Sequence, residues 1–538
     1  MSDSQYDPKI ISPSVVTAWL ACPHSLTLRL SGKGKPNSAR HFGNFAELIM
    51  QRGLQHEADC LESLRKQFSS EEILKLIKTS EKETFQEFND RVTVPEPHEY
   101  KVVYQAPLIF DGMRGIADFL VSVDSDGKPL PTFMPVDAKL ARNAAKPGHV
   151  LQLCFYADAI ENRTGVRPEK VEIWLGKSGR DEPEVIYLRD IDAYWNRSKK
   201  KLKAILESED LPQTEAVPCS HCTFCSYQET CEAEWKQNDS LFYVAGATKQ
   251  DREKLVDDGV HTRADLSIRT SPVNKLSSKR LAKLQRQAAA QVKSRASLTD
   301  DFVPSPSTHV EIFAKPAEIL EPYGFELLPP ADSGDIFLDY EGHPFWTIQE
   351  GLIFLFGYWS SDDKGRTWKF TDMWAHDKQS EQIAGEQLVK LITARQQQYP
   401  NMHVYHYNHT ERSSLASLLV EQTDTLDRFR ELVDKNIFID LYQIIRQGLI
   451  IGVESYGLKN IEKIAGFNRQ LPESAATKGA DAVVEYENYM IAVNEKRSID
   501  AQQHLLNIAL YNQGDVEATQ AVRDWLLQLR TIHYPKMP

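Results

Sequence analysis

Two groups of acidic residues, one in each half of the chain, have spacings that suit metal-dependent hydrolysis. In the first half, Asp137 and Lys139 lie two residues apart in a run that reads as a strand, so both side chains point to the same face. Asp118 lies on the strand before it. Carboxylates hold magnesium or manganese, the metal lowers the pKa of the attacking water, and a lysine stabilises developing charge. This combination predicts phosphodiester hydrolysis.

The elements around these acids also carry polar residues at regular spacing. Residues 101–142 read as strand, turn, strand, turn, strand, with FDG and DSDG as the turns. The following segment, HVLQLCFYADAI, predicts a helix on which Gln152 and Tyr156 share one face. Upstream, GLQHEADCLESL predicts another helix, which offers His56.

The second group lies in the C-terminal half. Asp339 and Glu341 are two apart on the predicted strand of DIFLDYEGHPF, and Glu411 follows Asn408 at a helix start. Tyr511 and Asp515 are four apart on a predicted helix. Four acids from separate elements can hold two divalent ions, with the tyrosine orienting the attacking water. The pattern predicts a second hydrolytic site.

Four of the seven cysteines crowd into residues 218–231, PCSHCTFCSYQETC. In a reducing compartment such a cluster favours a metal site over a disulfide framework. Thiolates suit both iron–sulfur clusters and zinc, and a zinc site would use all four cysteines of this segment. The residues alone leave the two metals open.

Composition limits the remaining possibilities. The chain has 538 residues, 41% of them hydrophobic, which predicts two or three domains. No apolar run is long enough to span a bilayer, and MSDSQYDPKI lacks the apolar core of a signal peptide, so we expect a cytoplasmic protein with no membrane partner. The net charge of −13 argues against nonspecific attraction of the whole protein to nucleic acid. The absence of a GxxxxGK[ST] loop excludes an ATPase motor of that type.

One segment departs from the acidic average. Residues 266–299 contain no Asp or Glu, and the run SSKRLAKLQRQAAAQVKSR predicts a basic helix. Its candidates for contact with nucleic-acid phosphates are Lys279, Arg280, Lys283 and Arg286. The alternative is a solvated linker helix. Just upstream, VAGATKQDREKLVDDGVHTRADLS predicts two short helices around a Gly-containing turn, similar to a helix-hairpin-helix unit.

These changes in composition and pattern along the sequence divide the chain into three parts. Residues 1–238 end with the cysteine cluster, residues 239–311 form a helical connector and linker, and residues 312–538 begin a new α/β pattern after the Pro/Ser-rich DFVPSPSTHV.

The N-terminal part resembles the RecB-like branch of the PD-(D/E)xK nucleases, which implies an α/β, restriction-endonuclease-like fold. The resemblance rests on the order His56, Asp118, Asp137, Lys139, then Gln152 and Tyr156, with Asp137 where Glu is commoner. Related nucleases carry an iron–sulfur cluster whose last three cysteines are spaced C-x2-C-x5-C. The resemblance therefore implies a 4Fe-4S cluster and leaves Cys219 spare; its implied ligands are Cys22, Cys222, Cys225 and Cys231.

The C-terminal part resembles the DEDDy 3′–5′ exonucleases of the ribonuclease H-like fold, with Glu411 where Asp is usual. Together, the two parts resemble RecB-like nucleases that carry a ribonuclease H-like domain. The resemblance does not supply a substrate. The function we expect is that of a metal-dependent DNA nuclease with two potential active sites, acting as an exonuclease in DNA processing, repair or defence. The alternative is a nucleic-acid-binding scaffold with one or both sites inactive, working with a separate helicase.

Overall fold

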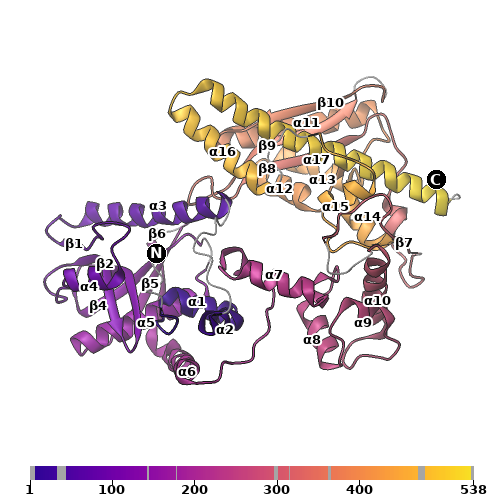
Figure 1. The fold of residues 1–538 in the computed structure, drawn as a ribbon. Helices are drawn as coiled ribbons and strands as arrows, with labels where there is room; N and C mark the ends of the chain where they lie inside the picture. The colour runs from indigo at the N-terminus through magenta and orange to yellow at the C-terminus, as the bar shows by residue number, and fades with distance from the viewer. Residues whose placement is uncertain are drawn as a thin grey trace. The chain divides into compact units, whose positions relative to one another are not determined.

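The chain divides by its internal contacts into two compact units. The first unit contains residues 1–232 and 345–350, and the second contains residues 233–344 and 351–538. The computed structural model (Figure 1) describes residues 7–32, 44–141, 144–176, 179–295, 301–313, 315–361, 365–470 and 479–534. Within these ranges, no helix combines the length and the apolar character needed to cross a membrane.

A six-stranded mixed sheet forms the centre of the first unit. Its strands, in spatial as well as chain order, are β1 (Ile73–Lys75), β2 (Val102–Phe110), β3 (Met113–Val123), β4 (Pro129–Lys139), β5 (Lys170–Leu175) and β6 (Gly179–Tyr187). The expected strand–turn–strand run is confirmed in β2 to β4, which pair antiparallel. Asp111 and Gly112 have φ of 49° and 76° in the first turn, as a tight two-residue hairpin requires. β5 runs parallel to β4.

Helices cover both faces of this sheet. Their bounds are α1 (Pro13–Ala21), α2 (Pro23–Ser31), α3 (Asn44–Gln67), α4 (Phe85–Arg91), α5 (Pro147–Thr164) and α6 (Leu188–Glu207). Leu153 and Phe155 of α5 pack into one core with Leu120 of β3, whereas Leu61 and Leu64 of α3 pack into a second core with strand residues of the opposite face. β4 therefore lies between α3 and α5, and its end is reached by polar residues from both.

The connector is helical, as its sequence predicts. It contains η2 (Leu241–Tyr243), α8 (Lys249–Asp257), α9 (Arg263–Ile268) and α10 (Ser278–Lys293), and it follows η1 (Cys222–Phe224) and α7 (Gln228–Gln237) of the cysteine-containing segment. Gly259, with φ of 80°, lies in the turn between α8 and α9. Leu255, Leu266 and Leu284 form a small core that joins α8, α9 and α10.

A five-stranded sheet forms the centre of the second unit, in the order β10-β9-β8-β11-β12. The bounds are β8 (Ile336–His343), β9 (Leu352–Ser361), β10 (Trp368–Trp374), β11 (Val404–His406) and β12 (Phe438–Asp440). β8, β11 and β12 are parallel, whereas β9 and β10 are antiparallel to their neighbours. A separate antiparallel pair joins β7 (Val310–Ile312) to β13 (Leu449–Ile451).

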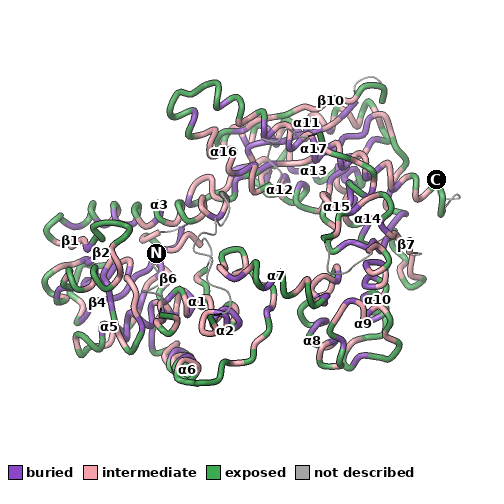
Figure 2. Tube along the Cα trace, viewed as in Figure 1, coloured by how far each residue is buried: buried purple, intermediate pink, exposed green. Residues whose placement is uncertain are grey.

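Helices cover both faces of this sheet too. Their bounds are η3 (Gly324–Leu327), α11 (Lys378–Gln398), α12 (Thr410–Leu418), α13 (Thr423–Asp434), α14 (Leu441–Gly448), α15 (Leu458–Ile464), α16 (Gly479–Asn494) and α17 (Ser498–His533). Leu388 of α11 packs with Leu338 in one core, and Val516 of α17 packs with Phe337 in another. Successive residues of β8 therefore face opposite layers. Figure 2 shows the buried residues concentrated along the strands.

Candidate active site

Three carboxylates meet where β8 passes beneath α17. Asp339, Glu341 and Asp515 each offer an oxygen, and these oxygens lie within 4.8 Å of one another. No other group of three His, Cys, Asp or Glu residues meets this distance among the described ranges. The arrangement follows from the two spacings in the sequence: Asp339 and Glu341 share one face of a strand, and α17 crosses β8 at Asp515. Such an acidic triad could hold a divalent metal ion.

Because these acids are buried close together, ionisation of Asp339 and Glu341 is disfavoured. Burial, followed by the charges of Asp515 and Glu341, raises the pKa of Asp339 well above its ordinary value. Burial and the charge of Asp515 raise the pKa of Glu341 to about 8. Like charges in a shared, desolvated site cannot all ionise without a compensating cation. This is the electrostatic setting in which bound cations stabilise a carboxylate cluster.

Asn512 supports the triad from α17. Its amide nitrogen donates hydrogen bonds to Asp339 Oδ2 at 2.7 Å and to Glu341 Oε1 at 3.4 Å. The side chain is fully buried and fits against Gly357 of β9, where a Cβ atom would lie 1.7 Å from Asn512 Oδ1. The glycine therefore makes room for the amide that holds the two strand carboxylates in place.

Two cations that the sequence analysis did not identify approach the triad. Lys459 Nζ lies 2.9 Å from Asp515 Oδ1 and 4.3 Å from the centre of the Tyr511 ring. Arg469 bridges Asp515 and Glu462, and its Nη1 is buried without a hydrogen-bond partner among the described residues. Gly514 permits this approach, since a Cβ there would lie 3.0 Å from Arg469 Nη1. Tyr511, one helical turn before Asp515, is buried beside them, and its pKa is raised by burial and by the Asp515 charge.

Glu411 lies near the triad without belonging to it. It is buried in the first turn of α12, and its charge also raises the pKa of Asp339. His406 Nδ1 lies 3.5 Å from Glu411 Oε2. Asn408, with φ of 84°, donates its backbone N–H to Asp440, which also caps α14 through the N–H of Tyr442. Asp440 therefore acts as the N-cap of α14 and also holds the backbone in front of Glu411.

The acids of the first unit meet at the end of β4. Phe119 pairs with Val136, which places Asp118 beside Asp137, and Asp118 Oδ2 accepts a hydrogen bond from the Ala138 N–H at 3.1 Å. Lys139 Nζ lies 2.7 Å from Asp137 Oδ2, in an ion pair without hydrogen-bond alignment. Burial, then the charge of Asp137, raises the pKa of Asp118 well above its ordinary value. Burial alone would lower the pKa of Lys139, but the two carboxylates outweigh it and the pKa is raised.

Both predicted residues of α5 reach this group. Gln152 donates its amide to Asp137 Oδ1 at 3.3 Å, and the Tyr156 hydroxyl donates to the Ile116 carbonyl at 2.7 Å. The pKa of Tyr156 is raised by burial and by the charges of Asp137 and Asp118. The helical spacing thus brings both side chains to the strand end that carries the acids.

His56, which the resemblance implies as a metal ligand, contacts the backbone of β5 in the structure. Its Nε2 lies 2.8 Å from the Trp174 carbonyl, and the structure brings it into no described contact with Asp118 or Asp137. The next residue, Glu57, faces the acids instead: burial and the Asp118 charge raise its pKa. Gln105 donates its amide to Glu57 from a backbone with φ of 60°, which is strained for a strand residue. Sequence spacing alone did not identify Glu57, although it adjoins His56.

The cysteine cluster gathers thiols from distant parts of the first unit. Cys22, at the end of α1, lies close enough to Cys219 and Cys225 for their charges to raise its pKa, after the larger effect of burial. Cys219 Sγ lies 3.9 Å from Cys222 Sγ, so Cys219 lies beside one of the ligands that the resemblance implies. Cys231 is buried in α7. Among the described residues, no three of these sulfur atoms lie within 4.8 Å of one another, and thiolates suit either an iron–sulfur cluster or zinc.

The basic residues of α10 divide into paired and unpaired cations. Lys279 pairs with Glu318 at 2.5 Å, Arg286 with Glu311 at 3.0 Å, and Arg280 with Asp251 at 2.6 Å. Lys283 has neither an ion-pair nor a hydrogen-bond partner in the described part of the chain. The structure therefore distinguishes Lys283 from the three residues grouped with it.

The two acidic groups lie in two ranges of the chain that match models of known families. Residues 10–232 match the model of the PD-(D/E)XK nuclease superfamily, and residues 336–527 match that of the RNase_H superfamily. No curated protein matches the chain. The first match contains Asp118, Asp137 and Lys139, and the second contains the Asp339, Glu341 and Asp515 triad.

Proposed function

Because this chain joins a PD-(D/E)XK nuclease superfamily domain to an RNase H superfamily domain, we propose that it is a metal-dependent nuclease that hydrolyses phosphodiester bonds in DNA at two active sites. The observation that carries the proposal is the convergence of Asp339, Glu341 and Asp515 within 4.8 Å. Magnesium or manganese held by such carboxylates supplies the positive charge that activates water and offsets the charge of a phosphodiester.

The surrounding residues of the second unit have separate tasks in this proposal. Asn512 fixes the orientation of Asp339 and Glu341 through its amide. Tyr511 places a hydroxyl beside the acids, where it can orient the attacking water. Lys459 and Arg469 hold positive charge beside Asp515 and would favour the negatively charged phosphate. Glu411 is buried near the triad, and we propose it as the fourth acidic residue of this metal site.

In the first unit, Asp118 and Asp137 are the proposed metal ligands, and Lys139 is proposed to position the nucleophile. Gln152 and Tyr156 support them from α5 through the Asp137 side chain and the Ile116 carbonyl. His56 stays a proposed ligand from the resemblance, and Glu57 is the acid that faces this site in the structure.

The cysteine group is proposed to hold a 4Fe-4S cluster with a structural role, its ligands being Cys22, Cys222, Cys225 and Cys231. Zinc stays the alternative, with Cys219 among its ligands. Either group would join α1 to a segment about 200 residues later, which restricts the unfolded chain and so stabilises the first unit.

A second candidate function is a nucleic-acid-binding scaffold that works with a separate helicase. The observation that favours it is the pairing of Asp515 with Lys459 and Arg469, because both cations compete with a metal for this carboxylate.

Calorimetric titration with Mn²⁺ separates the two functions. A nuclease site should bind Mn²⁺ at least about tenfold more tightly in the unaltered protein than in Asp339→Asn, since that substitution removes a charged ligand. Equal affinities for the two proteins would favour the scaffold. The matched control is Asp372→Asn, which changes a carboxylate outside the triad on β10, the edge strand that pairs with β9.

A further inference from the structure

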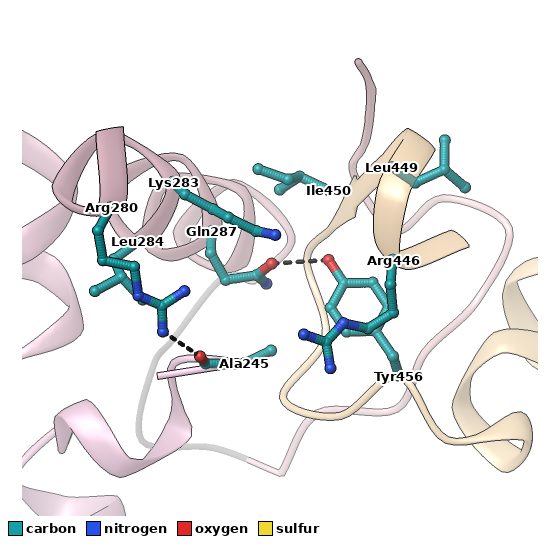
Figure 3. Close-up of a pocket in the computed structure, with 10 residues that line it drawn as sticks. Ala245, Arg280, Lys283, Leu284, Gln287, Arg446, Leu449, Ile450 and Tyr456 are labelled. Atoms are coloured by element: carbon teal, nitrogen blue, oxygen red, sulfur yellow. Dashed lines mark hydrogen bonds between the residues drawn. The ribbon is translucent and has the colours of Figure 1, made fainter. Parts of the chain in front are cut away.

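A pocket with a cationic rim lies between the connector helix α10 and the α14–β13 segment of the second unit. Figure 3 shows Arg280 and Lys283 extending from α10 and Arg446 extending from α14. Beneath these side chains, the pocket is lined by the buried residues Leu284 and Gln287. Its rim is therefore cationic and its floor is mainly apolar.

Hydrogen bonds fix the two walls of this pocket to each other. The Gln287 amide nitrogen donates to the Ile451 carbonyl at 2.8 Å, and its amide oxygen accepts from the Tyr456 hydroxyl at 2.8 Å. The Tyr456 hydroxyl oxygen also accepts from the Ile451 N–H at 2.9 Å. These buried hydrogen bonds hold α10 against β13. The positions of the three cations relative to one another are therefore fixed by the packing of the helices that carry them.

The positive charge at the rim is poorly compensated. Neither α10 nor residues 441–451 contain an acidic residue, although the chain as a whole carries a net charge of −13. Arg280 is paired with Asp251. Among the described residues, Arg446 donates a hydrogen bond to the Tyr442 hydroxyl at 3.1 Å and lies over the Tyr442 ring but pairs with no carboxylate, and Lys283 has no partner. Burial, then the charges of Arg446 and Arg280, lowers the pKa of Lys283. An anion in the pocket would relieve this repulsion.

The neighbouring cations of α10 differ in this respect. Lys279 and Arg286 each pair with a glutamate, so a phosphate would have to compete with an existing partner there. The pocket also lies close in sequence to the acidic triad, since Tyr456 precedes Lys459, which contacts Asp515, by three residues. A strand bound at the pocket would thus be held by the same segment that continues into the triad.

We propose that Lys283 and Arg446, with Arg280, form a binding site for a backbone phosphate of a nucleic-acid strand. This inference rests on the proposed nuclease function for the identity of its ligand. One phosphate contact on a single strand contributes about 0.7 to the slope of log affinity against log salt concentration. The site would act on binding of the strand and leave the chemistry at the carboxylates unchanged.

The test is fluorescence anisotropy with a 20-nucleotide single-stranded DNA, measured over a salt series with EDTA present to prevent hydrolysis. The double variant Lys283→Ala/Arg446→Ala should bind about tenfold more weakly, with a slope shallower by about 0.7. The matched control, Lys279→Ala, removes an exposed and paired lysine of the same helix and should change affinity less than twofold. Thermal unfolding of each variant checks that the fold is retained.

An unchanged slope in the double variant would overturn the inference, as would an equal loss in Lys279→Ala. Binding of inorganic phosphate that the double variant abolishes, with strand binding unaffected, would assign the pocket to a free anion and also overturn it. Hydrolysis of thymidine 5′-(4-nitrophenyl phosphate) with Mn²⁺ tests the proposed function separately. The double variant should retain this activity, whereas its absence from the unaltered protein would count against the nuclease proposal alone.

Discussion

Gly357 of β9 is the position at which a single methyl group should disturb the acidic triad most. A Cβ atom at this position would lie 1.7 Å from Asn512 Oδ1, 2.8 Å from Asn512 Cγ and 3.0 Å from Phe370 Cε2. Since these distances are far below van der Waals contact, Gly357→Ala requires the buried Asn512 side chain to move. Its hydrogen bonds to Asp339 and Glu341 would then be lost.

The magnitude follows from two losses. Hydrogen bonds to charged groups contribute about 1.5–3 kcal/mol, and overpacking of a filled interior costs about 1–3 kcal/mol. We therefore expect Gly357→Ala to lower the free energy of unfolding by about 3–5 kcal/mol.

Urea unfolding of the full chain in EDTA, followed by circular dichroism, measures this change. Gly342→Ala is the matched control, because Gly342 lies on β8 beside Glu341 and its nearest Cβ contact would be an ordinary 3.4 Å to the Leu352 carbonyl. The control should change stability by less than about 1 kcal/mol. Equal stabilities for the two variants would refute the role assigned to Asn512.

Two further predictions concern the ionisation of the triad and the cysteines. Burial raises the pKa of Glu341 from 4.5 to about 8 in the folded chain, so its contribution to stability is greatest below pH 4.5 and is lost as the pH rises to 8. Between pH 5 and pH 8 in EDTA, Glu341→Gln should therefore lose less stability than the unaltered protein, by about 3.5 kcal/mol; parallel urea-unfolding profiles would contradict this. Protein purified without oxygen should be brown, with about four iron and four sulfide per chain, and Cys219→Ser should keep the colour whereas Cys22→Ser should not. Stoichiometric zinc without iron would instead support the zinc alternative.

Regular spacing explains which parts of the site could be predicted from the sequence. Side chains alternate along a strand, so Asp339 and Glu341 had to share a face, and one helical turn separates Tyr511 from Asp515. The hairpin turn at Asp111 and Gly112 and the helix carrying Gln152 follow from equally local patterns.

Contacts between distant segments explain what the sequence did not reveal. Lys459 reaches Asp515 across 56 residues, and Gly357 meets Asn512 only because α17 crosses β9. Neither pairing has a spacing signal. Likewise, the rotation of α3 against the sheet decides whether His56 or Glu57 faces Asp118. The helical pattern of the sequence does not determine this rotation to within one residue.

The central claim is that the Asp339, Glu341 and Asp515 triad catalyses metal-dependent cleavage of DNA. Its most direct test is the rate of degradation of end-labelled single-stranded DNA with Mn²⁺ by Lys139→Ala, a variant in which the N-terminal site lacks its lysine. We predict that this variant keeps activity that EDTA abolishes, and that Lys139→Ala/Asp339→Asn is slower by about three orders of magnitude. Equal rates for the two variants, or no cleavage by Lys139→Ala, would contradict the account.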